Sequence, residues 1–356
     1  MKLGFGFYRH MLDETHFRFA RQCGATHAVV HLVDYFNQGG SNTRTDQPIG
    51  DRHGWGHAGD PDKLWTVEEL AAIKADLNRH GLEWAAVENL DPAHWHDILL
   101  GGPRRDEQID KVCTIIRNLG EVGIPVLGYN FSLAGVAGRV KATTRGDAEV
   151  VALAGAVDDP IPKGMVWNMV YDREAEPGFM APTTHEEFWD RFAYFLNAVI
   201  PVAEEAGVTL ALHPDDPPMP TLRGQPRLVY QPRFYQKMVD LNPSPRNAME
   251  FCVGTVAEMS EGDVAETIDL HSQQGRVAYV HLRNVRGKVP HYSEVFIDEG
   301  DVDIAKILRI LHGNGFDGVI IPDHAPQMTC DAPWHAGMAF AMGYLKAKME
   351  AATRGE

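Results

Sequence analysis

The chain has 356 residues and a formal net charge of −16 at pH 7, and its length suits one large α/β barrel or two smaller domains. The acidic balance argues against nucleic-acid and anionic-membrane partners, which need basic surfaces, but it allows an anionic small substrate held by local arginines and a cation. The four cysteines are scattered, the sequence shows no signal-peptide pattern, and no apolar run approaches the ~18 residues of a membrane span. These features predict a reducing, cytoplasmic compartment.

Strand-like and helix-like segments alternate along the whole chain. Short apolar runs typical of strands buried on both faces occur at residues 2–7, 27–32, 83–89, 126–131, 209–214, 248–254, 278–284 and 318–324. Segments with helical periodicity lie between and after them, the clearest at residues 66–81, 104–123, 185–207, 301–315 and 338–352. The first of these helices opens with Thr66 and Glu69, a capping-box pattern, and most of the others end at a glycine.

Eight strand–helix units in a chain of this length predict a single-domain (β/α)8 barrel, the TIM-barrel fold of the α/β class, over residues 1–356. A doubly wound open sheet is the alternative, but the chain lacks a GxGxxG motif after its first strand. Residues 33–65 and 132–183, after the second and fourth strands, are too long to be plain turns, and the second holds a predicted hairpin around 148–159. In a barrel both loops overhang the catalytic face, where long loops are usually functional.

Metal-type ligands lie near the C-terminal ends of the last four predicted strands. Each is weak evidence alone. A buried cysteine between apolar neighbours, such as Cys252 between Phe251 and Val253, is more often a small core residue than a ligand. Their joint position changes that interpretation, because the C-terminal strand ends of a barrel converge on one face. We therefore predict a divalent metal held by His213, Cys252, His281 and Asp323. Two imidazoles, a thiolate and a carboxylate suit zinc or iron and can accept manganese.

Several sequence blocks resemble the mannonate dehydratases, within the wider xylose-isomerase-like group of barrels. The matching blocks are residues 103–131, LALHPDDPP (210–218), MEFCVGT (249–255), VHLRNVRG (280–287), GDVDI (300–304) and PDH (322–324). LHPDDPP and FCVGT are rather specific, whereas PDH alone would mean little. Together the blocks cover most of the chain from residue 80 onward.

The resemblance implies a metal-dependent lyase of hexuronate breakdown, which removes water from a sugar acid, D-mannonate or a related aldonate, to give a 2-keto-3-deoxy acid. It implies the same four ligands for the metal, with Mn²⁺ the usual cofactor, and a role as catalytic acid or base for His324. It also implies a homodimer, and a small sugar acid rather than a macromolecule as the partner.

Physical chemistry suggests further site residues. Abstracting the proton next to a carboxylate builds up negative charge, which a metal and the Arg283 guanidinium could hold, with Asn284 beside it. Expelling the neighbouring hydroxyl needs an acid poised near neutral pH, and histidine suits that task. Sugar hydroxyls could be bound by Glu88 and Asn130, which stand at the ends of the third and fourth strands.

The chain departs from the family pattern around the substrate. The family's first strand reads roughly Arg-Trp-Tyr-Gly, and this chain has Gly-Phe-Tyr-Arg at residues 6–9. Of the family's Asp-Trp-Thr-Arg in the loop after the fourth strand, only Arg139 remains, which we predict to bind substrate. The family's catalytic tyrosine has no clean counterpart, so His335 and Tyr292 are candidates to replace it.

Three other functions remain open at this stage. A metal-dependent sugar isomerase or epimerase would use the same barrel, with a carboxylate such as Glu88 shuttling the proton and no need for Arg283. A barrel-type DNA-repair endonuclease would use similar ligands, but the acidic balance counts against it. A non-catalytic sugar-acid-binding barrel would explain the missing tyrosine.

Overall fold

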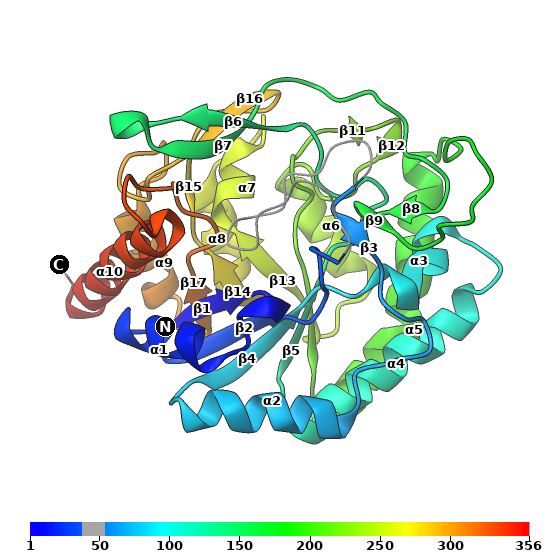
Figure 1. Cartoon of the computed structure of the whole chain (residues 1–356), viewed down its shortest axis with the longest axis horizontal. Coiled ribbons are helices and arrows are strands. Elements are labelled where there is room, and N and C mark those ends of the chain that lie inside the picture. The colour runs from blue at the N-terminus through cyan, green and yellow to red at the C-terminus, as the bar shows by residue number, and fades with distance from the viewer. Residues whose placement is uncertain (38–53, 356) are drawn as a thin grey trace.

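Eight parallel strands close into a barrel at the centre of the molecule (Figure 1). The computed structural model describes residues 1–37 and 54–355. The barrel order is β1-β17-β14-β13-β10-β5-β4-β2, and every neighbouring pair is parallel. The strands are β1 (Lys2–Phe7), β2 (His27–His31), β4 (Glu83–Glu88), β5 (Val126–Tyr129), β10 (Thr209–Leu212), β13 (Asn247–Cys252), β14 (Val277–His281) and β17 (Val319–Ile321). The predicted α/β barrel fold is confirmed, and each strand lies within or next to its predicted run.

Helices surround the barrel and connect its strands. They are α1 (Glu14–Gln22), α2 (Val67–Arg79), α3 (Pro92–Leu100), α4 (Arg105–Val122), α5 (His185–Ala206), α6 (Arg233–Leu241), α7 (Val253–Glu258), α8 (Val264–Gln273), α9 (Ile304–Gly313) and α10 (Pro333–Arg354), with 3-10 turns η1 (Arg9–Met11) and η2 (Arg145–Asp147). The Thr66 side chain accepts a hydrogen bond from the Glu69 N–H, as the capping pattern predicts. The last helix begins before residue 338, because Pro333 is well suited to the first turn of a helix.

The core has two parts that follow from burial on both faces of the strands. The larger lies between the barrel and its helices. A small cluster fills the inside of the barrel and consists of Val29, Ala86, Ala211, Tyr279, Val319 and Ile321. At Gly128 of β5, an added Cβ would lie 2.2 Å from the Tyr279 hydroxyl and 2.6 Å from Glu250 Oε2. Glycine at this position leaves room for polar groups inside the barrel.

The two long loops carry their own small sheets. Residues 132–183 hold β6 (Arg139–Thr143), β7 (Glu149–Leu153), β8 (Met165–Val166) and β9 (Met169–Val170). The predicted hairpin exists, but β7 pairs with β6 before it, and residues 154–159 form no strand. In the 33–65 loop, β3 (Gly56–His57) pairs with β9, while residues 38–53 lie outside the described residues.

A hairpin that the sequence did not predict completes a cap over the catalytic face. It consists of β15 (Asn284–Lys288) and β16 (His291–Val295), which pair antiparallel. With β7 and β6 they form a four-stranded sheet in the order β15-β16-β7-β6, at the top of Figure 1. Because β15 follows directly on the C-terminal end of β14, this sheet stands over the strand ends. A short pair, β11 (Thr221–Leu222) and β12 (Gln225–Pro226), lies in the loop after β10.

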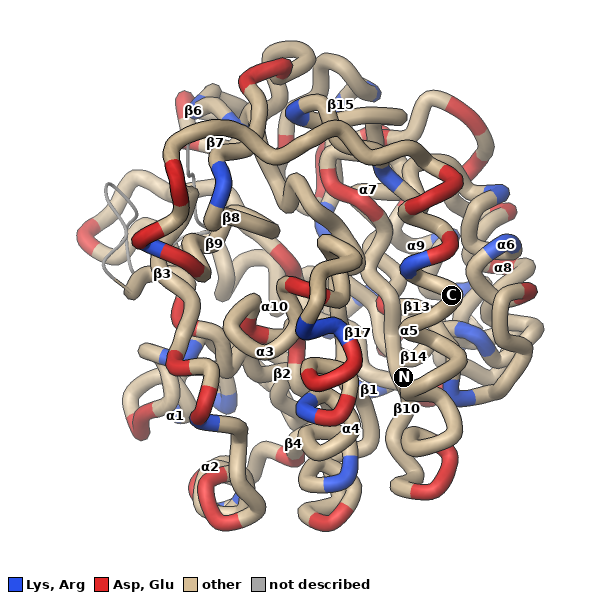
Figure 2. Tube along the Cα trace, turned by 90° about the vertical axis from the view of Figure 1, so that its right-hand side faces the viewer, with Lys and Arg blue, Asp and Glu red and all other residues tan. Residues whose placement is uncertain are grey.

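Residues of both charges are intermixed along the outer helices and loops (Figure 2). Among the described residues, none of the helices combines the length and the apolar run that crossing a bilayer needs.

Candidate active site

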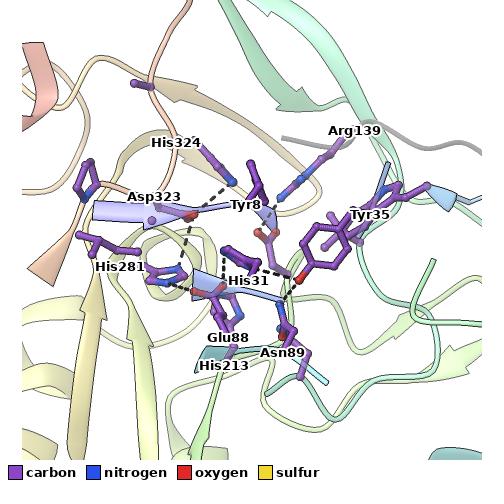
Figure 3. A pocket seen from close by; sticks show the side chains of 18 of the residues that line it. Tyr8, His31, Tyr35, Glu88, Asn89, Arg139, His213, His281, Asp323 and His324 are labelled. Carbon is purple, nitrogen blue, oxygen red and sulfur yellow. Dashed lines mark hydrogen bonds and ion pairs between the residues drawn. The ribbon is translucent and has the colours of Figure 1, made fainter. Parts of the chain in front are cut away.

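A cavity opens at the C-terminal ends of the barrel strands and brings together most of the predicted site residues (Figure 3). The predicted residues that line it are Glu88, Asn130, Arg139, His213, His281, Asp323 and His324. They come from β4, β6, β14 and the segments that follow β5, β10 and β17. Cys252, at the end of β13, is fully buried just beneath them.

The four predicted metal ligands converge. The ligand atoms of His213, Cys252 and His281 lie within 4.8 Å of one another. Asp323 joins them, with its Oδ2 3.8 Å from the Cys252 Sγ and its Oδ1 3.6 Å from the His281 Nδ1. Four residues that are far apart in the sequence therefore meet because neighbouring strands of the barrel end at one level.

The hydrogen bonds of both histidines leave one ring nitrogen directed to the cluster. His213 Nδ1 donates to the Pro214 carbonyl at 2.6 Å, so Nε2 is the nitrogen directed to the cluster. His281 Nε2 faces two carboxylates, Glu88 Oε2 and Glu250 Oε1, each at 3.1 Å. That nitrogen therefore carries the proton, and the buried Nδ1 has no hydrogen-bond partner in the described part of the chain.

The surroundings of the Cys252 sulfur favour its thiolate form. It caps the N-terminus of α7, where the N–H and the hydroxyl of Thr255 lie 3.5 and 3.1 Å from Sγ. Burial by itself raises the pKa of Cys252, but the Arg283 guanidinium and the imidazoles of His213 and His281 lower it to about 6. The thiolate is the form that binds metals.

Glu88 and Glu250 form a second acidic group behind His281, and the sequence analysis did not single out Glu250. Burial would raise the pKa of Glu88, yet His31 and His281 lower it to about 2. Burial and the charge of Glu88 raise the pKa of Glu250 to about 8. This arrangement resembles the carboxylates that orient metal-bound histidines from behind, through the nitrogen that does not bind the ion.

The donor set fits a divalent cation. It combines a thiolate, a carboxylate and one imidazole nitrogen from each of two histidines. Cys252 and His281 are buried and His213 and Asp323 partly buried, and the His281 Nδ1 has no hydrogen-bond partner among the described residues. A buried cluster of negative groups needs a positive charge to balance it.

His324 lies beside this cluster and faces the cavity. Its Nε2 is 3.2 Å from Asp323 Oδ1, and its Nδ1 is 3.0 Å from Glu294 Oε1 of the unpredicted β16 strand. Burial alone would lower the pKa of His324, but the Asp323 and Glu294 carboxylates outweigh it and raise that pKa above its usual value. An imidazole held in this way can deliver a proton to a group in the cavity.

Arg283 does not line the cavity. Its side chain is 1% exposed and forms ion pairs with a ring of carboxylates. The distances are 2.5 Å to Glu258, 2.9 Å to Asp216, 2.9 Å to Asp323 and 3.5 Å to Glu294. Arg283 thus fixes the Asp323 carboxylate from behind, and its guanidinium is occupied by these groups.

Replacing Arg283 by methionine is expected to destabilise the fold strongly, because the substitution leaves several buried carboxylates without their cation. Such losses cost about 3–5 kcal/mol, or roughly 4–7 °C in melting temperature for a chain of this length. Arg286→Met is the control, because Arg286 is exposed and its guanidinium contacts Glu299 at the surface, 3.8 Å from the carboxylate and 2.8 Å from the backbone carbonyl. Its loss should shift the melting temperature by less than about 1 °C. Equal melting temperatures for the two variants would contradict this role for Arg283.

Three further predicted residues lie away from the cavity lining. Asn284 Nδ2 donates to the carbonyls of Ile297 and Val302, so its amide holds a loop. The Tyr292 hydroxyl donates to Asp216 Oδ1 at 3.0 Å. His335 packs its ring on Phe19, 4.8 Å between centroids, on the side of α1 and α10.

The cavity also contains residues that the sequence analysis did not single out. The main ones are Tyr8, His31, Tyr35, Trp55, Asn89, Trp167 and Asp216. Glu250 had a recoverable signal, because it stands two positions before Cys252 on one strand and therefore points to the same side. Trp167 and Trp55 come from loops, where no periodicity indicates which side chains face the cavity.

The closed barrel with its strand-end cluster defines the chain as an α/β barrel protein, and its fold is similar to those of xylose isomerase domain proteins. A xylose isomerase domain protein from Planctomyces limnophilus superposes with a TM-score of 0.58 at 12% identity, covering 99% of this chain and 98% of that one. The mannonate dehydratase from Streptococcus suis serotype 2 superposes more closely, with a TM-score of 0.77 at 24% identity over 100% of this chain and 95% of that one. Both likenesses concern the fold.

Sequence comparison identifies the family. The model of the D-mannonate dehydratase family matches residues 1–170 and 178–352. Mannonate dehydratase 2 of Halalkalibacterium halodurans is 31% identical over 279 residues, which span 73% of this chain and 79% of the relative. The chain belongs to the D-mannonate dehydratase family, whose enzymes are hydro-lyases, and the predicted family resemblance is confirmed.

Proposed function

We propose that this enzyme dehydrates an aldonic acid, with D-mannonate the first candidate, to a 2-keto-3-deoxy acid. The observation that carries the proposal is the convergence of His213, Cys252, His281 and Asp323 beside His324 in one cavity. Family membership supplies the reaction class, and the geometry supplies groups suited to it. The isomerase and epimerase alternatives share the barrel, but no observation favours them over the family's reaction.

The four converging residues would hold the metal, and we propose Mn²⁺, with Fe²⁺ or Zn²⁺ as alternatives. When bound, the ion would supply positive charge next to the substrate carboxylate, where negative charge develops as the neighbouring C–H bond breaks. Glu88 and Glu250 hold His281 by its Nε2. Asp323 is held by Arg283. The chain thereby fixes two of the four ligands before any ion arrives.

Arg139 is the residue we assign to the substrate's charged end. Among the described residues that line the cavity, it is the only arginine or lysine. Its Nη2 lies 3.4 Å from Asp216 Oδ2, and this ion pair orients the guanidinium. Arg283, our first candidate for that role, would instead act through Asp323 and Asp216.

His324 is the residue we assign to proton transfer to the departing C3 hydroxyl. It lines the cavity, stands next to the ligand Asp323, and is oriented by Glu294 through Nδ1. Its Nε2 is the nitrogen on the side of Asp323. Glu88 and Asn130, both in the lining, would bind substrate hydroxyls.

Removal of the metal is expected to abolish turnover. Protein stripped with a chelator should lose activity on D-mannonate to background, and Mn²⁺ should restore it more fully than Zn²⁺. The measurement is formation of 2-keto-3-deoxy acid across a panel of aldonic acids, before and after adding each ion. Full activity in verified metal-free protein would contradict the proposed metal dependence.

We further propose that residues 1–356 act as one catalytic domain, with the insertions at 33–65 and 132–183, and that two chains form a homodimer. Light scattering of the purified protein would give twice the mass of one chain. A single-chain mass would contradict the dimer without affecting the catalytic proposal.

A further inference from the structure

A backbone outlier at the edge of the cavity marks a residue to which the proposed metal binding and proton transfer assign no role. Trp167 and Asn168 connect β8 to β9 as a two-residue hairpin turn, and both have positive φ, +48° and +60°. Two positive φ values in such a turn favour Asn-Gly and similar pairs. For a bulky residue such as tryptophan this conformation is a true outlier. Strain of this kind persists only where the surrounding structure imposes it.

Two glycines and two hydrogen bonds impose that conformation here. The Trp167 N–H donates to the Leu133 carbonyl at 2.8 Å, and the Trp55 N–H donates to the Asn168 carbonyl at 2.7 Å. An added Cβ at Gly54 would lie 2.5 Å from the Asn168 carbonyl oxygen. An added Cβ at Gly135 would lie 2.9 and 3.0 Å from backbone atoms of Trp167. The neighbouring loops are therefore shaped to accept the hairpin tip at close range.

The strained turn directs an aromatic ring to the cavity. Trp167 lines the cavity and packs edge-on against Trp55, 5.4 Å between ring centroids, and tilted against Tyr35 at 5.5 Å. Together these three rings form the aromatic wall, defined as Tyr35, Trp55 and Trp167. Because each ring supports the next, the face that Trp167 offers to the cavity is held rigidly.

The aromatic wall lies across the cavity from the metal-type ligands. A chain of contacts separates the two: His281 to Glu88 at 3.1 Å, Glu88 to His31 at 3.5 Å, and His31 to the Tyr35 hydroxyl at 3.0 Å. Trp167 lies one ring beyond Tyr35. In Figure 3, His281 and Asp323 stand on one side of the cavity and Tyr35 on the other.

We propose that Trp167 is a specificity-determining residue that packs against the carbon chain of the sugar acid on the side away from the metal-type ligands. The inference rests on the proposed function, which places the substrate carboxylate at the other end of the cavity. A hydroxylated carbon chain presents C–H groups on one side, and a rigid aromatic face offers them apolar contact without requiring a particular hydrogen bond. Trp167 thereby discriminates between sugar acids by the length of their carbon chain, and it does not contact the carbons that react.

The test compares a six-carbon with a four-carbon aldonate on manganese-loaded full-length protein, by calorimetric binding and by turnover. Trp167→Gly removes the ring and suits the positive φ. It should weaken binding of the six-carbon acid about tenfold, a typical effect of one lost apolar contact, and that of the four-carbon acid less than twofold. Trp167→Phe should recover most of the loss. Gly135→Ala, whose added Cβ would contact Asn168 Oδ1 and the Trp167 backbone rather than the ring, should act like Trp167→Gly but more weakly.

The ratio of the two affinities is measured on one protein sample, so partial unfolding of a variant cancels out. An equal loss for both acids would show that Trp167 only supports the fold and would overturn the inference. No loss, or no binding of either acid by the unmodified protein, would overturn it too. Binding that depends on chain length without any turnover would leave the role of Trp167 standing and would refute the dehydratase function instead.

Discussion

Replacing His324 by asparagine is expected to lower kcat for the aldonate about 10²–10⁴-fold, the usual contribution of a positioned proton donor. Asparagine keeps hydrogen-bonding atoms near Glu294 and Asp323 but has no proton that it can transfer. Manganese affinity should change little, because His324 is not among the four converging ligands. Steady-state kinetics together with equilibrium dialysis of the metal would separate the two effects.

His335→Asn is the matched control. His335 was a candidate for the same chemistry, but it does not line the cavity, and its ring packs on Phe19 and Trp334. That variant should keep kcat within about twofold. A large loss in His335→Asn, or full activity in His324→Asn, would contradict the assignment of proton transfer to His324.

Replacing Cys252 by serine is expected to weaken manganese binding at least about 100-fold and to abolish turnover at ordinary metal concentrations. A hydroxyl stays neutral where the thiolate carries a charge, so the ion loses both a ligand and its counter-charge. The fold should survive, because serine is a favourable N-cap for α7, the helix that Cys252 now caps. Equilibrium dialysis gives the affinity, and circular dichroism checks the fold.

Cys113→Ser provides the comparison, because Cys113 is also a buried cysteine but lies on α4, in the core between barrel and helices. It should lose some stability and keep its manganese affinity. If both serine variants bound the metal equally well, the thiolate would not be a ligand.

Much of the fold was predictable because it depends on local patterns. The barrel strands are apolar runs buried on both faces, and the helices between them show clear periodicity and capping signals, such as Thr66 with Glu69. The positions of His213, Cys252, His281 and Asp323 followed from the same logic. Once eight parallel strands close, residues at their C-terminal ends have to converge.

The remaining part of the site depends on long-range packing that no local pattern shows. The β15–β16 hairpin brings Glu294 to His324 and Tyr292 to Asp216. The sequence around Arg283 is equally compatible with a substrate ligand and with an internal ion pair. Only the arrangement of four carboxylates around its guanidinium distinguishes the two.

The departures from the family pattern fall on the substrate side of the cavity. Tyr8 follows directly on the first strand and lines the cavity, within a segment that departs from the family's order of residues. The loop after β5 keeps Arg139 and also carries the hairpin that presents Trp167. The ligand cluster thus keeps the residues that the family resemblance implies, whereas the segment after the first strand and the loop after β5 do not. Substrate choice within the aldonates is therefore the property in which this enzyme should differ from its relatives.

Mass spectrometry of the product formed from D-mannonate by the manganese-loaded protein tests the central claim most directly. A dehydratase releases a product lighter than the substrate by one water, with the 2-keto-3-deoxy structure, and the Cys252→Ser variant should form none of it. A product of unchanged mass would instead show an isomerase or epimerase on the same barrel and would contradict the dehydration proposed here.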